Sequence, residues 1–176
     1  MKQEGEASGA RLALLDLDVD AGKVKEAEPS VRQVLEVVRR LKSPAGEANA
    51  RALLARIAVA QGRAAEAKSE AEQARTLAIK SEDRSVRLRL EIACARVFGT
   101  LGEKERALAV ASLRHAQDDA TRAGMLPLLF EARLALAEIE VRSSRAVAQK
   151  HLRQLQNEAK IKGFAWVASR AAAAAR

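Results

Sequence analysis

Residues 10–22 read ARLALLDLDVDAG, and residues 50–62 read ARALLARIAVAQG. The two stretches begin 40 residues apart, and each ends on a glycine. The glycines with this spacing are Gly22, Gly62 and Gly102. The alanines that follow them after five residues are Ala27, Ala67 and Ala107. A fixed period shared by three units indicates a repeat protein.

Apolar residues within these stretches recur every three or four positions, as at Leu53, Leu54 and Ile57. This spacing predicts amphipathic helices. A glycine at the end of each helix favours a turn, because it enters the left-handed conformation without a Cβ clash. The 40-residue shift aligns Leu14 with Leu54 and Leu17 with Ile57, and we expect all four to face inward.

The pattern predicts an all-α fold of four helical hairpins. They cover about residues 8–42, 47–81, 85–123 and 127–162. The fourth is recognised because ARLALLDLDV, from Ala10, returns as ARLALAEIEV, from Ala132, after 122 residues. The expected second helices are Val24–Leu41, Ala64–Lys80, Lys104–Ala123 and Arg145–Ile161. We expect a last helix over 164–175, with Phe164, Trp166 and Val167 over the fourth hairpin, to cap the array.

The turn glycines, the alanines after them and the small residues Ala55 and Ala95 resemble the tetratricopeptide (TPR) repeat, in a form of 40 residues rather than 34. The resemblance implies a right-handed αα superhelix whose first helices line a concave groove. Arg11, Arg51 and Glu91 depart from it, since they stand where the family usually has aromatic residues. The end of the chain, from EARLALAEIEVRSS to KGFAWVASRAAAAAR, resembles the C-terminal repeat tract of large bacterial signalling proteins with a Ser/Thr kinase or winged-helix domain. By that resemblance we expect a fragment of a larger protein.

The composition excludes several classes of protein. The chain has 176 residues, a formal charge of +8, one cysteine and two histidines. A single cysteine excludes a disulfide scaffold. No apolar run reaches the length of a membrane span and no leader precedes the helices, so we expect a cytoplasmic protein with no membrane partner. His115 and His151 lie in different hairpins without Cys or His one turn away, and no phosphate-binding or hydrolase motif occurs, so we expect no metal, no cofactor and no enzyme.

The favoured function is protein interaction through the groove. By the resemblance to the TPR family, the groove positions include acids at Asp16 and Asp20. Its central polar residues are Asn49, Arg56, Arg89 and Arg96. Arginine suits the forked recognition of a carboxylate, so these residues predict an acidic peptide, a protein partner or another domain of the parent chain. The alternative is that these arginines pair with neighbouring acids of the chain itself.

A second candidate surface lies near the C-terminus. Residues 141–176 hold eight basic residues and one acidic residue, a net charge of +7. Helical spacing places four of the basic residues within about 80° of one another. They are Arg142, Arg145, Arg153 and Lys160. Such a basic stripe is the alternative function, binding of nucleic acid or another anionic surface, although nearby aromatic residues for stacking are few. An ordinary solvated helix face and end-to-end self-association are the remaining interpretations.

Overall fold

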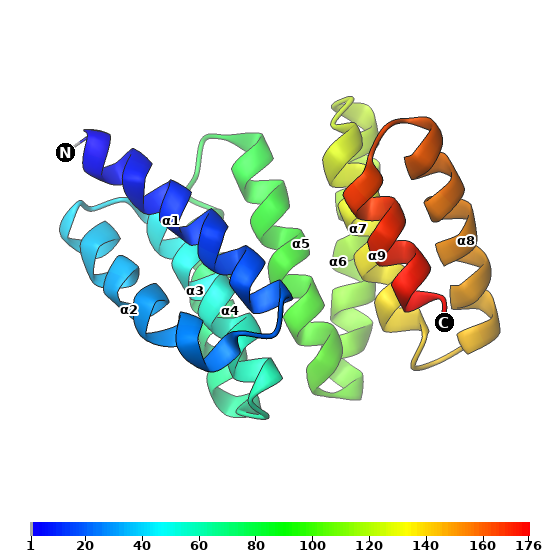
Figure 1. The fold of residues 1–176 in the computed structure, drawn as a ribbon, viewed down its shortest axis with the longest axis horizontal. Coiled ribbons are helices and arrows are strands. Elements are labelled where there is room, and N and C mark those ends of the chain that lie inside the picture. Colours follow the sequence, from blue (N-terminus) through cyan, green and yellow to red (C-terminus); the bar gives the residue numbers. More distant parts are fainter. Residues whose placement is uncertain (1) are drawn as a thin grey trace. The chain divides into compact units, whose positions relative to one another are not determined.

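The computed structural model describes residues 2–176, and these residues form nine α-helices and no β-strand (Figure 1). The prediction of an all-α fold is therefore confirmed. The helices are α1 (Lys2–Asp20), α2 (Val24–Arg40), α3 (Pro44–Ala60), α4 (Ala64–Ala78), α5 (Arg84–Leu101), α6 (Glu103–Arg122), α7 (Leu126–Glu140), α8 (Arg145–Ile161) and α9 (Ala165–Ala174). The expected second helices correspond to α2, α4, α6 and α8, with ends that differ by at most two residues.

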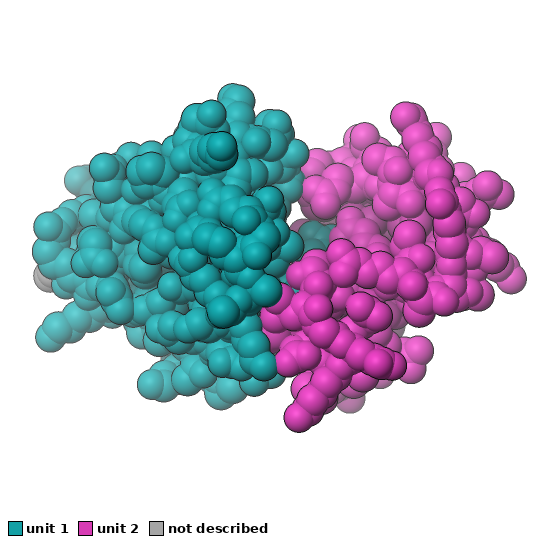
Figure 2. All heavy atoms as spheres, turned by 90° about the horizontal axis from the view of Figure 1, so that it is seen from below, with its two compact units in different colours: residues 1–97 teal, residues 98–176 magenta. Residues whose placement is uncertain are grey.

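The chain divides into two compact units, Met1–Val97 and Phe98–Arg176 (Figure 2). The division falls within α5. In the first unit, one apolar cluster joins α1, α2 and α3, and α4 packs on α3. In the second unit, another cluster joins α7, α8 and α9, and α6 packs on α7. Each unit therefore has its own core.

Two of the predicted turn glycines end helices as expected. Gly22 and Gly62 have φ angles of 84° and 74°, which a side chain would strain. The amide of Arg63 donates to the carbonyl of Ala58 at 2.8 Å, the six-residue closure of a Schellman turn. Gly102 differs, because its φ of −127° is extended and it is the N-cap of α6. The prediction that Gly102 ends a helix as Gly22 and Gly62 do is wrong.

The second helices bury residues in the same pattern, at i, i+4, i+7 and i+11. The four sets are Ala27, Val31, Val34 and Val38; Ala67, Ala71, Ala74 and Ala78; Ala109, Leu113, Ala116 and Ala120; and Ala148, Leu152, Leu155 and Ala159. The third set follows the second after 42 residues rather than 40. Ala109 therefore takes the place predicted for Ala107, which is exposed. The physical reason is that α5 continues to Leu101 and a single residue, Gly102, connects it to α6.

The first helix departs from the prediction. Leu14 and Leu17 are 64% and 59% exposed, whereas Leu54 and Ile57 are 2% and 0% exposed. Leu54 and Ile57 are buried because they pack in the cluster formed with α1 and α2. The expectation that Leu14 and Leu17 face inward is wrong, since no other helix of the first unit covers that side of α1.

The last helix packs on its neighbours. Val167 is buried in the cluster with α7 and α8, and the ring of Phe164 meets that of Phe130 edge to face at 5.2 Å between centroids. Trp166 stays half exposed, with the guanidinium of Arg170 5.5 Å from its ring centre. Two of the three residues expected to cover the fourth hairpin therefore do so.

Candidate functional site

The four residues predicted for the groove all lie in the first unit. Asn49 and Arg56 are on α3, and Arg89 and Arg96 are on α5. Asn49 and Arg89 stand 40 residues apart, and both are exposed. Arg56 and Arg96 also stand 40 residues apart, and both are half-buried. The 40-residue shift thus relates two exposed positions and two half-buried ones.

Arg56 is held by two carboxylates of α1. Its Nη1 atom donates a hydrogen bond to Asp16 and its Nη2 atom donates one to Asp20. Asp16 and Asp20 are four residues apart, which puts them on one side of the helix. The alternative interpretation, arginines paired with neighbouring acids, therefore describes Arg56. An incoming carboxylate would have to compete with Asp16 and Asp20 for this guanidinium.

A buried arginine that sequence reasoning did not single out for binding lies next to this surface. Arg51, on α3, is 5% exposed. Its guanidinium donates to Glu47 at 2.9 and 3.0 Å and to Glu70 of α4 at 2.8 Å. Burial opposes the charge of Glu47, but hydrogen bonds from Arg51 and Arg39 hold the pKa of that carboxyl below its usual value. This group connects α3 and α4 and acts as a structural anchor.

The predicted basic stripe lies in the second unit. Arg145, Arg153 and Lys160 are exposed on α8. Arg142 lies in the turn before α8, so it does not continue the helical face, and it donates to the carbonyl of Thr100 at 3.3 Å. Arg145 donates to the carbonyl of Arg176 at 2.8 Å. Within residues 2–176, no Asp or Glu side chain forms an ion pair with any of the four.

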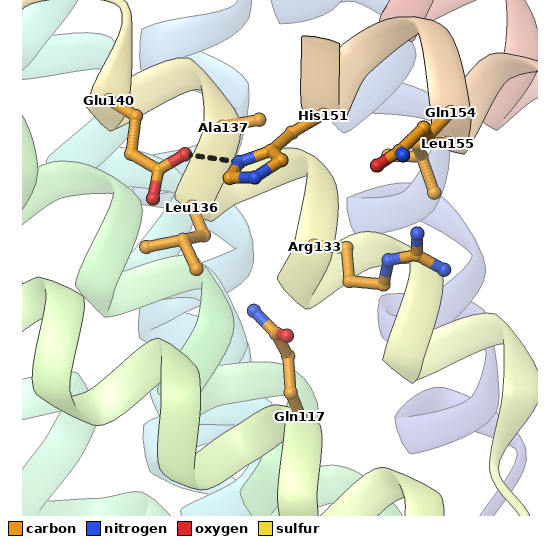
Figure 3. Close-up of a pocket in the computed structure, with 8 residues that line it drawn as sticks. All are labelled: Gln117, Arg133, Leu136, Ala137, Glu140, His151, Gln154 and Leu155. Atoms are coloured by element: carbon orange, nitrogen blue, oxygen red, sulfur yellow. Dashed lines mark hydrogen bonds and ion pairs between the residues drawn. The ribbon is translucent and has the colours of Figure 1, made fainter. Parts of the chain in front are cut away.

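A pocket of about 190 Å³ lies in the second unit between α6, α7 and α8, and none of the predicted site residues lines it (Figure 3). Oε2 of Glu140 and Nδ1 of His151 form a hydrogen bond of 2.8 Å, and this bond orients the imidazole. Arg133 donates to Glu158, and this bond keeps the pKa of Glu158 below its usual value. The buried Nε2 of Gln117 has no hydrogen-bond partner. Sequence reasoning tested His151 for metal binding alone, and Glu140, eleven residues away across a turn, gave no signal.

The polar side chains of the pocket can form hydrogen bonds with a ligand. Its lining holds two glutamines, an arginine and a histidine paired with a glutamate, and it contains no Ser, Thr, Cys or Lys. The cysteine of the chain, Cys94, is buried in the first unit, and burial raises the pKa of its thiol to about 12, so the thiol stays protonated. Among the described residues, no three His, Cys, Asp or Glu side chains gather closely enough to hold a metal ion.

The sequence matches no protein-family model, and comparison with curated proteins finds no match. Among the described residues, no helix is both long and apolar enough to cross a bilayer.

Proposed function

We propose that the chain is a non-catalytic scaffold of the TPR type, which binds an acidic peptide or partner domain, in the setting of bacterial signalling. In this proposal the four hairpins form a right-handed superhelix capped by α9, and the first helices line its concave groove. The groove residues are Asn49, Arg56, Arg89 and Arg96.

The contact between Asp16 and Arg56 carries the proposal. These residues stand 40 positions apart, on α1 and α3, and they meet side chain to side chain. The helices α1 and α3 also pack on each other. Positions one period apart are therefore neighbours on one surface in this part of the chain, which is the arrangement that a groove of first helices requires.

Charge within this surface suggests how a ligand would bind. Arg89 is exposed, so a ligand carboxylate reaches it without displacing buried groups. Arg56 becomes available when the ligand replaces Asp16 or Asp20, which are partly exposed. We therefore assign the first contact to Arg89, with Arg56 as an exchangeable second contact.

Fluorescence anisotropy with a labelled decapeptide of Glu and Ala tests the groove. Arg89→Glu should weaken binding about tenfold or more, because a favourable charge becomes a repulsive one. Arg153→Glu makes the same change in charge on α8 and should leave this binding within about twofold. Equal affinities for the wild type and Arg89→Glu would remove the groove from consideration.

A gain of binding provides the complementary test. Asp16→Asn together with Asp20→Asn keeps the side-chain shape and releases the charge of Arg56. The double variant should bind the decapeptide several-fold more tightly, and a weaker binding would contradict the role given to Arg56. Circular dichroism establishes that the variant keeps its helices.

Binding of nucleic acid or another anionic surface by the basic stripe is the second candidate function. The observation that favours it is that, within the described residues, no Asp or Glu side chain pairs with Arg142, Arg145, Arg153 or Lys160. Binding to duplex DNA or RNA should fall steeply with salt. For duplex DNA, the logarithm of the binding constant should fall against the logarithm of the salt concentration with a slope of about −0.9 for each phosphate contacted. No binding at about 50 mM salt would exclude it, since electrostatic association is stronger there than at higher salt.

A further inference from the structure

One side of α1 is apolar and open to solvent. Ala10, Ala13, Leu14 and Leu17 are all exposed, and their spacing places them on one face of the helix. We refer to these four residues as the outer face of α1. Isolated exposed leucines are common, but two leucines and two alanines on one helical stripe form the kind of surface that packs on another helix.

The corresponding faces of other helices are covered. A shift of 40 residues converts the outer face into Ala50, Leu53, Leu54 and Ile57 of α3, which are buried against α1 and α2. A shift of 122 residues converts it into a face of α7 that includes Ile139. This residue packs so closely on Gly99 of α5 that a Cβ there would lie 2.4 Å from its Cδ1. The outer face of α1 is therefore the uncovered member of a set of faces that pack on helices.

The distribution of charge along the chain indicates which partner can cover the outer face of α1. Residues 1–42 contain eight basic and eight acidic residues and are neutral overall, whereas residues 141–176 carry +7. Residues 1–42 therefore add no net repulsion when two copies approach through α1, while two C-terminal ends repel each other. Arg11 and Asp18 lie on one edge of the outer face, next to α2, and they carry opposite charges. Arg11 also contacts Gln33 at 3.3 Å, and Asp18 is 3.1 Å from Lys23.

We propose that two copies of this chain associate through the outer faces of α1, antiparallel about a twofold axis between residues 14 and 15. The axis places Arg11 of each copy opposite Asp18 of the other, since both are equally far from it along the helix and lie on the same edge. The leucines of both copies then leave water together, and the small Ala10 and Ala13 let the helices approach closely. This pairing uses none of the proposed groove residues, so an experiment that contradicts the groove does not contradict the pairing.

Sedimentation equilibrium of the full chain from about 1 µM to about 1 mM tests the pairing. The wild type should pass from the mass of one chain to the mass of two. Leu14→Gln with Leu17→Gln should weaken association at least about 100-fold, because four leucine side chains stay in water. Ile161→Gln is the matched control, since Ile161 is 82% exposed on α8, and it should associate as the wild type does.

Exchange of the two charges tests the geometry. Arg11→Asp alone and Asp18→Arg alone each create two like-charge pairs and should weaken association about tenfold. The double variant restores opposite charges and should return to within about threefold of the wild type. A wild type that stays monomeric, a species larger than two chains, a leucine variant that pairs normally, or a double variant no better than the single ones would each overturn the proposal.

Discussion

Nη1 of Arg51 donates a hydrogen bond of 2.8 Å to Oε2 of Glu70, and this bond connects α3 to α4. By the resemblance of the sequence to the TPR repeat, Arg51 stands where that family usually has an aromatic residue. An aromatic side chain fills such a position by packing, whereas a buried arginine requires carboxylate partners. The chain provides two, Glu47 and Glu70.

Removal of Arg51 should therefore cost more than removal of an exposed arginine. Arg51→Met leaves Glu70 partly buried without its partner and should lower the free energy of unfolding by roughly 2–4 kcal/mol. Arg51→Met with Glu70→Leu should recover much of that loss, because the buried charge is removed as well. Arg40→Met, whose pair with Glu4 is exposed, should cost less than about 1 kcal/mol. Urea unfolding measures the free energy of unfolding of all three variants. Equal losses of stability for Arg51→Met and Arg40→Met would contradict the role of Arg51 as a structural anchor.

The stability of the chain should fall in acid because of Glu28. Burial opposes the charge of Glu28, but hydrogen bonds lower the pKa of its carboxyl from 4.5 to about 2. The donors are Arg32, Gln61 and Arg63. The unfolded chain therefore takes up the proton first, so this contribution is present above pH 4.5 and is lost as the pH falls towards 2.

Glu28→Gln isolates this effect. The variant should be less stable than the wild type at neutral pH, and the difference should shrink as the pH falls from 4.5 to about 2. Urea midpoints of both proteins across that range provide the measurement. Two parallel curves would show that Glu28 does not contribute to the acid dependence.

Among the glycines of the second unit, Gly99 leaves the least room for a side chain, because Ile139 packs against it. Gly99→Ala puts a methyl group 2.4 Å from Cδ1 of Ile139 and should cost about 1–3 kcal/mol of unfolding free energy. Ile139→Val or Ile139→Ala in the same chain should reduce that cost, because room is made for the methyl group. Gly5→Ala, in an open part of α1, should instead stabilise by about 0.5–1 kcal/mol. A cost for Gly99→Ala that is unchanged beside Ile139→Ala would exclude the contact as its cause.

Gly62 and Gly102 should respond differently to alanine. Gly62→Ala forces a side chain into a φ of 74° and should cost about 1 kcal/mol. Gly102→Ala keeps an allowed φ of −127°, and the group nearest its new Cβ is the carboxylate of Glu105, the end of a flexible side chain. It should cost less than Gly62→Ala. Thermal unfolding of the two variants compares these costs. A larger loss of stability for Gly102→Ala than for Gly62→Ala would indicate that Gly102 is a turn glycine after all.

Local patterns predicted the helices well and their register less well. The ends of α8 match the prediction because Ser144 and Gly163 flank a clear amphipathic run. In the third hairpin the predicted register is wrong by two residues. Gly102 occurs at the expected spacing and predicts a buried Ala107, but the buried residues of α6 begin at Ala109. A two-residue change of register leaves the amphipathic pattern of each helix intact, so the separate helices give no sign of it.

The sequence by itself determined that this protein is helical, where most of its helices begin and end, and that basic charge gathers near the C-terminus. These properties depend on residues a few positions apart, through helix periodicity and turn chemistry. The tertiary structure decided that Arg56 is bound by Asp16 and Asp20, that Arg51 is buried with Glu70, and that Leu14 is exposed while Leu54 is buried. Those outcomes depend on which helix lies against which, and residues with the same local pattern differ in burial when a neighbouring helix covers one and not the other.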